Sequence, residues 1–249
     1  MALFLSLIST RIREQASDLV GKRLLAEYGA VFIARGGAIP PDRIIFRDQM
    51  DVEEFQNKVS FQEIGFDGTT IELQTSAANR LADAIGAARE KALTITPRGA
   101  DSGRRSYEET ERLWKSRVDP ALDHWIGKGR LSETEAETIR RLSPFEQVPI
   151  VLDLEKDGLF FSKDFSKTIL YSVAPPGTSQ HLSMLAFDVA EFNQPEVREI
   201  LEDHFWYQTV PSDLPHFTFL GVPASELINL GLKKVEQAER SFWVPDLNT

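Results

Sequence analysis

Two short apolar segments constrain how this 249-residue chain can fold, because each carries a polar side chain of a kind that binds metal ions. Side chains alternate between the two faces of a strand. Residues 184–190 would therefore place Asp188 on one face and large apolar side chains on the other. In residues 216–220, His216 would lie opposite Phe217 in the same way. We expect two strands whose apolar faces enter a core and whose polar faces can be reached by a metal ion.

A third polar side chain, His181, precedes Asp188 by seven positions. An extended chain rises ~3.3 Å per residue and would hold these two residues about 23 Å apart, too far for two ligands of one ion. A turn is therefore expected within residues 182–184. Two imidazoles, from His181 and His216, and the carboxylate of Asp188 form a ligand set that suits zinc and leaves a fourth position for water. The alternative is structural: a loop histidine, a carboxylate that caps a strand end and a histidine that is satisfied within a core.

The composition limits the other classes of function. The chain contains no cysteine, so any metal site must use nitrogen and oxygen ligands. Its formal net charge of −10 disfavours nucleic acid as a partner. No apolar run approaches the ~20 residues needed to cross a bilayer, so no transmembrane segment is expected. Residues 2–8 are apolar but lack the preceding basic residues of a secretory signal, and we interpret them as the start of a first helix. The oligomeric state is not predicted.

The order of expected elements mixes helices with strands and shows no regular strand–helix–strand repeat, which favours the α+β class. Helical spacing or capping residues predict helices over residues 6–27, 76–92, from Ser106 onward with a break or kink at Pro120, after Ser132, over 195–205 and over 225–240. Apolar or alternating runs predict strands over residues 28–34, 43–46, 70–73, 93–96, 185–189 and 216–220. Residues 144–177 are predicted to be rich in loops.

Three separated motifs of this chain resemble the zinc D-Ala-D-Ala carboxypeptidase and D,D-dipeptidase family. The family pattern is Ser-x-His-x-x-Gly-x-Ala-x-Asp followed by Glu-x-Trp-His. The first half is matched by Ser179, His181, Ala186 and Asp188, whereas Met184 replaces the glycine. In the second half, which ends at His216, Asp213 replaces the glutamate and Pro215 replaces the tryptophan. Upstream, residues 102–107 read Ser-Gly-Arg-Arg-Ser-Tyr and are similar to the family's Ser-Gly-Tyr-Arg-Ser-Tyr segment.

The resemblance covers roughly residues 70–220 and implies a role for each matched residue. His181, Asp188 and His216 would bind zinc. Asp213 would be the catalytic base, and Arg105 would bind the terminal carboxylate of the substrate, with Arg98 and Arg104 as nearby rivals for that role. Ser179 would bond a ligand or the substrate.

The resemblance also implies the fold and the place of action. The family shares its fold with the hedgehog signalling domain, so we expect an antiparallel sheet flanked by helices. Residues 70–249 would form the metallopeptidase-like domain, and residues 1–69 an N-terminal extension or accessory layer. Peptidoglycan stem peptides would be the substrate, and the periplasm or cell exterior the location. Two alternatives stay open: a peptidoglycan endopeptidase of the same fold, and a zinc-bearing binding or structural module without catalysis.

Overall fold

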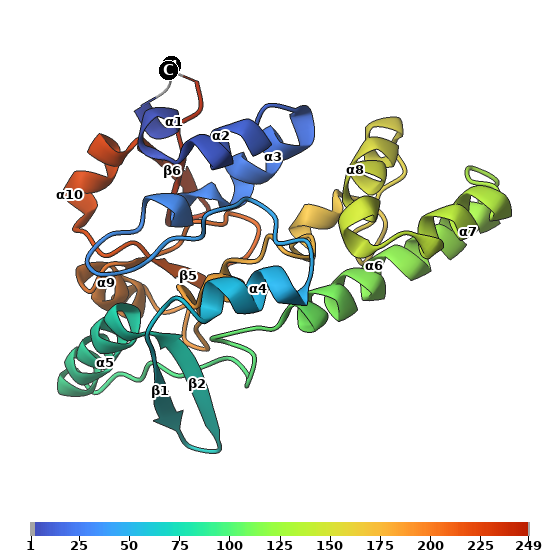
Figure 1. Ribbon diagram of the computed structural model, residues 1–249. Helices are drawn as coiled ribbons and strands as arrows, with labels where there is room; N and C mark the ends of the chain where they lie inside the picture. Colours follow the sequence, from blue (N-terminus) through green and yellow to red (C-terminus); the bar gives the residue numbers. More distant parts are fainter. Residues whose placement is uncertain (1–2, 249) are drawn as a thin grey trace. The chain divides into compact units, whose positions relative to one another are not determined.

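The computed structural model describes residues 3–248 and shows helices mixed with small antiparallel sheets, which confirms the α+β class (Figure 1). The chain divides into two units, which we call the sheet unit and the helical unit. The sheet unit comprises Met1–Ile44, Glu53–Arg105 and Gln180–Thr249; the helical unit comprises Ile45–Val52 and Ser106–Ser179. The proposed accessory role of residues 1–69 stays a prediction.

The sheet unit contains short helices from both ends of the chain. Its α-helices are α1 (Leu3–Leu7), α2 (Thr10–Gln15), α3 (Leu19–Tyr28), α5 (Thr75–Glu90), α9 (Pro195–Asp203) and α10 (Ala224–Leu227). Its 3-10 helices are η1 (Gly29–Ile33), η4 (Gln180–Ser183) and η5 (Ile228–Leu230). Helix α4 (Gln49–Gln56) contributes residues to both units.

The strands of the sheet unit pair in three antiparallel sheets within the described residues. One hairpin joins β1 (Phe61–Phe66) to β2 (Thr69–Gln74), and another joins β6 (Leu232–Gln237) to β7 (Arg240–Pro245). The third sheet has the order β3 (Ala186–Asp188), β5 (His216–Phe219), β4 (Trp206–Tyr207). Every residue of this central sheet is buried or nearly so, and it carries two of the predicted ligands.

The central sheet is fixed by aromatic packing on its apolar face. Phe187, Phe217, Phe219 and Trp206 are almost completely excluded from solvent. The ring of Trp206 lies 6.2 Å from that of Phe187 and 5.4 Å from that of Phe219, centroid to centroid. Burying each such side chain contributes about 1.5–3 kcal/mol to folding. The predicted apolar faces of both strands are thus confirmed.

The helical unit consists of consecutive helices, with a longer irregular segment between η2 and η3. It contains α6 (Tyr107–Gly127), α7 (Glu133–Arg141), α8 (Pro144–Leu154), η2 (Glu155–Asp157) and η3 (Ile169–Tyr171). The predicted capping boxes at Ser106 and Ser132 are both present. Helix α6 continues through Pro120, which excludes the predicted restart and leaves the alternative of a kink as a prediction. None of the described helices is both long and apolar enough to span a bilayer.

The N-terminal predictions are largely wrong. The single helix predicted over residues 6–27 is three helices, because Ser9 and Asp18 each cap a new start: their side chains accept hydrogen bonds from backbone N–H groups three residues on. The strand predicted over residues 28–34 is η1. All five of its residues are buried, and a run that is buried on every side has no periodicity to separate a strand from a helix.

Three further predictions of secondary structure are wrong. In each segment a side chain accepts a hydrogen bond from a backbone N–H group. Residues 43–46 form no strand, and the Ile44 N–H donates to the side chain of Gln15 over 2.7 Å. Residues 93–96 form no strand either, since the Thr96 N–H donates to Glu191 over 2.8 Å. The start of the predicted loop region 144–177 is helix α8. A third capping box, formed by Ser143 and Glu146, begins this helix and Pro144 occupies its first turn.

The helix predicted over residues 225–240 is also wrong. Helix α10 ends at Leu227 and is followed by η5, and the segment from Leu232 onward forms the β6–β7 hairpin, whose turn is Ala238–Glu239. Both turn residues have positive φ, 49° and 61°. Their sequence gives no turn signal, because such two-residue turns are dominated by Asn and Gly. Strand β1 was not predicted, whereas β2, α5, β3, α9 and β5 confirm the expected elements at residues 70–73, 76–92, 185–189, 195–205 and 216–220.

The β6–β7 turn offers a test of the fold. Replacing Ala238→Asn and Glu239→Gly together should raise the free energy of unfolding by about 1 kcal/mol, because these residues adopt positive φ more readily. The melting temperature should rise by about 2–4 °C. The matched control is Gly68→Ala in the β1–β2 turn, where φ is +79°; it should lower stability. A stabilising Gly68→Ala, or a destabilising hairpin variant, would contradict the assigned turns.

Candidate metal centre

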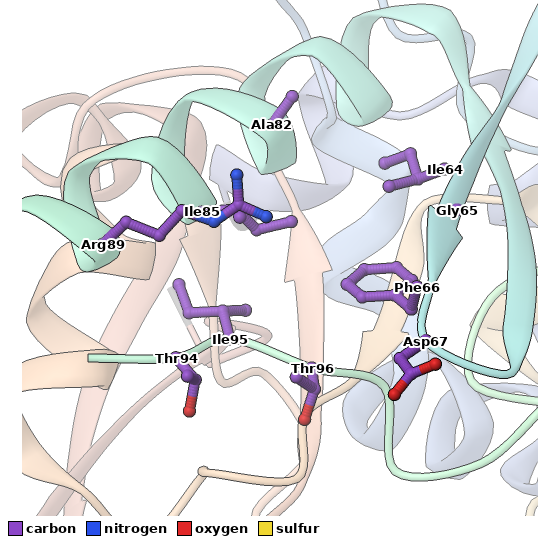
Figure 2. A pocket seen from close by; sticks show the side chains of 10 residues that line it. All are labelled: Ile64, Gly65, Phe66, Asp67, Ala82, Ile85, Arg89, Thr94, Ile95 and Thr96. Atoms are coloured by element: carbon purple, nitrogen blue, oxygen red, sulfur yellow. The ribbon is translucent and has the colours of Figure 1, made fainter. Parts of the chain in front are cut away.

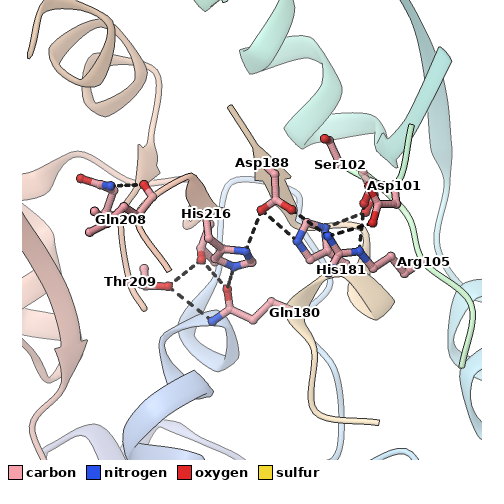
Figure 3. A network of polar contacts seen from close by, with 12 residues as sticks. Asp101, Ser102, Arg105, Gln180, His181, Asp188, Gln208, Thr209 and His216 are labelled. Carbon is pink, nitrogen blue, oxygen red and sulfur yellow. Dashed lines mark hydrogen bonds and ion pairs between the residues drawn. The ribbon is translucent and has the colours of Figure 1, made fainter. Parts of the chain in front are cut away.

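The three predicted ligands come together in the sheet unit (Figure 3). One ligand atom from each of His181, Asp188 and His216 lies within 4.8 Å of the others. Oδ1 of Asp188 is 3.2 Å from Nε2 of His181 and 3.2 Å from Nδ1 of His216. These residues are 1%, 9% and 5% exposed, respectively. The structure thus contains a buried group of two imidazoles and one carboxylate that could hold a metal ion.

The pairing of two strands sets the distance between Asp188 and His216. In the antiparallel β3–β5 pair, Asp188 lies directly opposite His216, and Ala186 lies opposite Thr218. Side chains that are opposite each other point to the same face of the sheet. Asp188 and His216 therefore share the face away from the phenylalanines, as the alternation of the sequence predicts.

His181 reaches the same point through a tight turn. Helix η4 covers residues 180–183, and the N–H of Met184 donates to the carbonyl of His181 over 3.1 Å. The predicted turn within residues 182–184 is therefore confirmed. Met184 has φ +57°, the left-handed conformation for which glycine is suited. This conformation costs about 1–2 kcal/mol, which complete burial of the Met184 side chain can offset.

Two buried glutamines hold the carbonyl groups of this turn. Nε2 of Gln56 donates to the carbonyl of Leu182 over 3.0 Å, and Nε2 of Gln74 donates to that of Ser183 over 2.8 Å. The backbone N–H of Gln74 also donates to the carbonyl of Met184. Three successive carbonyls are thereby satisfied without regular secondary structure. Sequence reasoning missed both glutamines, because no short motif contains them.

The tautomer of His181 follows from its second contact. Its Nδ1 lies 2.8 Å from the carbonyl oxygen of Gly103. A carbonyl can only accept, so Nδ1 carries the proton and the lone pair of Nε2 faces Asp188. The backbone at Gly103 approaches β2 so closely that a Cβ there would lie 2.9 Å from the carbonyl oxygen of Glu72. Only glycine fits this position without displacing either β2 or the Gly103 carbonyl that contacts His181.

Burial sets the charges in the group. It lowers the pKa of His181, so this imidazole is neutral. The guanidinium of Arg105, 2.7 Å from Oδ2 of Asp188, favours the ionised form of this carboxylate. An ionised carboxylate oxygen and an imidazole lone pair therefore face each other at 3.2 Å. Two electron pairs so placed repel each other unless a cation lies between them, and this donor set fits zinc.

His216 has a second partner that the sequence did not reveal. Its Nε2 lies 2.8 Å from Oε1 of Gln180, which also accepts a hydrogen bond from the Thr218 hydroxyl. The amide nitrogen of Gln180 donates to the carbonyl of Tyr28 over 2.9 Å. Gln180 is the residue between the two motif positions Ser179 and His181, and the family pattern leaves it unspecified.

Arg105 is the second charged residue at the centre. Its Nη2 lies 2.7 Å from Oδ2 of Asp188, and its Nε donates to the carbonyl of Asp101 over 2.9 Å (Figure 3). The neighbouring Arg104 is engaged elsewhere, with Glu72 and Gln56. The structure therefore places Arg105 beside the candidate ligands. Its role in binding a substrate carboxylate stays a prediction.

The predicted base, Asp213, is exposed and lies in the turn before β5. Its carbonyl accepts a hydrogen bond from the backbone N–H of His216 over 3.2 Å. Its role as a base stays a prediction, as does the ligand contact of Ser179, which is buried.

A second carboxylate, missed by sequence reasoning, lies near Asp213. Glu27 accepts a hydrogen bond from the Ser212 hydroxyl over 3.1 Å, and burial raises the pKa of Glu27. Burial likewise raises the pKa of the Tyr28 hydroxyl well above its ordinary value, and the charges of Glu27 and Asp213 raise it further. The charges of both carboxylates therefore affect the pKa of the same tyrosine. No motif marked Glu27, which belongs to the N-terminal third of the chain.

A separate groove of about 450 Å³ lies between α5, β1 and the segment after α5 (Figure 2). Its walls are mostly apolar, with one guanidinium and one carboxylate at the surface. The lining residues are Ile64, Gly65, Phe66, Asp67, Ala82, Ile85, Arg89, Thr94, Ile95 and Thr96. None of the candidate metal ligands lines it, so the groove and the metal centre are different sites.

Comparison with known proteins yields a distant structural likeness. No protein-family model matches the chain, and no curated protein matches it. A solved structure of a vancomycin resistance D,D-pentapeptidase VanY mutant, from a VanB-type resistance cassette and in complex with Zn(II), is 16% identical over 78% of this chain and 89% of its own, with a TM-score of 0.39. VanYB in complex with D-alanine-D-alanine is 17% identical over 70% of this chain and 84% of its own, with a TM-score of 0.38. At these values the chain is not assigned to their family.

The metal centre predicts binding of one zinc ion per chain, measured by elemental analysis of the purified protein. Losing an outer hydrogen-bond partner of a ligand typically weakens metal binding by about 10- to 100-fold. His181→Ala removes a ligand itself, so it should weaken zinc binding by more than this. The control is His204→Ala: this imidazole contacts the carbonyl of Ile200 and lies outside the group. Equal zinc content in wild type and His181→Ala would contradict the assignment.

The raised pKa of Glu27 predicts a pH-dependent effect of Glu27→Gln on stability. A carboxyl whose pKa is raised by folding stabilises the protein below its unfolded pKa, and this stabilisation is lost as the pH rises through the folded pKa. The amide that replaces the carboxyl is neutral at every pH, so the variant should melt about 1–3 °C higher than wild type at about pH 8 and show no gain at about pH 4. Thermal melts at both pH values measure this, with the exposed Glu63→Gln as control. A gain confined to low pH would contradict it.

Proposed function

We propose that this protein is a zinc-dependent peptidase of the D-Ala-D-Ala carboxypeptidase type that acts on peptidoglycan stem peptides. The observation that carries the proposal is the convergence of His181, Asp188 and His216, which lie far apart in the sequence, on one point. We infer the substrate class and the hedgehog/D,D-peptidase-like fold from the resemblance of the motifs around these residues. The proposed location is the periplasm or the cell exterior.

His181, Asp188 and His216 would hold the zinc ion. When bound there, zinc would supply a Lewis acid that lowers the pKa of a coordinated water towards ~7. The protein's own contribution is the orientation of the ligands. Gly103 fixes the tautomer of His181, and the β3–β5 register fixes the separation of Asp188 and His216.

Peptide hydrolysis also requires a group that removes a proton from the attacking water and delivers it to the leaving amine. We propose Asp213 for this role, because it stands three positions before His216, as the family's glutamate does. Its side chain is one methylene shorter than glutamate. Glu27 is the rival, because its carboxyl has a raised pKa and lies beside Ser212.

Arg105 would orient the C-terminal carboxylate of the substrate. A guanidinium has five N–H donors, and the contacts described above use Nε and one Nη atom. Donors therefore remain for a carboxylate, which a guanidinium can bind through two parallel hydrogen bonds. Because Arg105 also contacts Asp188, a substrate carboxylate held there would lie close to the metal ligands.

Two other functions fit the same metal centre. A peptidoglycan endopeptidase would use the same residues on an internal bond, whereas a zinc-bearing binding module would hold the ion without turnover. The position of the cleaved bond distinguishes the first, and the absence of hydrolysis by zinc-loaded protein distinguishes the second.

The proposal predicts release of D-alanine from a peptide that ends in D-Ala-D-Ala, measured with the zinc-loaded protein. Asp213→Asn should lower kcat by about 10²- to 10⁴-fold while zinc content is kept, because proton transfer contributes a factor of that size. Glu27→Gln should leave kcat nearly unchanged.

The opposite pattern, with Glu27→Gln inactive and Asp213→Asn active, would move the role of base to Glu27. His204→Ala is the matched control for a histidine outside the centre and should keep full activity. If zinc-loaded wild type hydrolyses neither this peptide nor purified peptidoglycan, the proposed enzymatic activity is overturned. The zinc-bearing binding module would then be the remaining function.

A further inference from the structure

We propose that Gln180 is a positioning residue that fixes the tautomer of the metal ligand His216 and takes its own orientation from the N-terminal segment. This inference rests on the metal centre of the proposed function. It deepens that function by connecting the ligand group to α3 and η1. Gln180 is almost completely buried, at 3% exposure, and lies in η4 immediately before His181.

The orientation of the Gln180 amide is determined by Tyr28. Nε2 of Gln180 lies 2.9 Å from the carbonyl oxygen of Tyr28, which can only accept a hydrogen bond. If the amide were rotated by half a turn, its oxygen would face that carbonyl oxygen at the same distance. Two acceptors in a buried site repel each other and leave both groups unsatisfied. The nitrogen of the amide must therefore point to Tyr28, and the oxygen to His216.

Two threonines complete the hydrogen bonds of the amide in this orientation. The hydroxyl of Thr218 donates to Oε1 of Gln180, so its oxygen must accept from Thr209, which lies 2.6 Å away. The oxygen of Thr209 is then free to accept the second N–H of the Gln180 amide, over 3.4 Å. Every donor in this ring of three side chains has an acceptor (Figure 3 shows Gln180, Thr209 and His216). The contact with the Tyr28 carbonyl selects this orientation, because the two hydroxyls can rotate to suit either one.

The tautomer of His216 follows from the orientation of the amide. Oε1 of Gln180 accepts from Nε2 of His216 over 2.8 Å, so in an imidazole that carries a single proton, that proton lies on Nε2. Its Nδ1 is then left with a lone pair that faces Oδ1 of Asp188 over 3.2 Å. His181 presents its Nε2 lone pair to the same oxygen. Both imidazoles thus direct a lone pair to one point only because each has an acceptor behind it: Gly103 for His181 and Gln180 for His216.

The experiment compares three variants by two readouts: zinc affinity from chelator competition, and the tautomer of His216 from ¹⁵N chemical shifts of the imidazole in metal-free protein. Gln180→Met keeps the shape of the side chain but removes the acceptor. It should weaken zinc binding by about 10- to 100-fold and populate the Nδ1–H form of His216. Gln180→Glu keeps an acceptor oxygen for His216 in either protonation state. It should therefore retain zinc affinity near that of wild type, even if the melting temperature falls.

The third variant, Gln147→Met, is the matched control. Gln147 is a buried glutamine that bonds Trp114 and the carbonyl of Ile139, away from the metal centre. This variant should lose stability without loss of zinc affinity. If Gln180→Glu lost as much zinc affinity as Gln180→Met, Gln180 would have only a structural role and the inference would be overturned.

The failure of this inference can be told apart from failure of the proposed function. Wild type that binds no zinc would overturn the function, but the ¹⁵N spectrum of His216 would still test the role of Gln180. A wild-type spectrum with the proton on Nδ1 of His216 would overturn the inference whatever the zinc affinity. An unchanged His216 tautomer and unchanged zinc affinity in Gln180→Met would do the same.

Discussion

The direct pairing of Asp188 with His216 across β3 and β5 is the contact on which the candidate metal centre depends. It brings an ionised carboxylate and an imidazole to 3.2 Å in a buried position. A shift of one residue in the register would turn one of the two side chains into the aromatic core. The packing of Phe187, Phe217 and Trp206 on the other face excludes that shift, because it would expose large apolar surface. The aromatic core therefore holds the ligands in register without touching them.

The rest of the centre is held by hydrogen bonds to backbone carbonyls rather than by regular secondary structure. The turn that returns His181 to Asp188 contains a left-handed Met184, and the side chains of Gln56 and Gln74 satisfy its carbonyls. Each of these buried amides costs free energy if it loses its partner, about 1–3 kcal/mol. The turn is consequently costly to deform, which preserves the position of His181. Rigid ligands are what a metal centre requires for a defined coordination geometry.

His181, Asp188 and His216 could be predicted from the sequence as a candidate ligand group because the motifs around them are local. The alternation in residues 184–190 and 216–220 indicated the two strands, and the seven-residue spacing required a turn before Asp188. The outer partners were not predictable in this way. Gln180 and Tyr28 are 152 positions apart, and Gln56 and Leu182 are 126 apart, so only the folded chain shows that they meet. Several of these partners are backbone carbonyls, which have no sequence signature at all.

The errors in secondary structure have similar physical causes. Residues 28–34 are apolar on every side, so their period could not distinguish a strand from the observed η1. Residues 225–240 have apolar side chains at helical spacing, but Gly231 and the positive-φ pair Ala238 and Glu239 direct the chain into a hairpin. Ser9 and Asp18 are capping residues within a helical pattern, and each starts a new helix. Burial on every side thus obscured the first segment, whereas local capping and turn conformations decided the other two.

The central claim is that two imidazoles and one carboxylate bind a single zinc ion. X-ray absorption at the zinc edge of the loaded protein tests it most directly, because the spectrum reports the ligands of the ion itself. The account predicts a shell of nitrogen and oxygen atoms at about 2.0–2.1 Å with the outer scattering of two imidazole rings and no sulfur. A shell of oxygen atoms alone, without imidazole scattering, would contradict it.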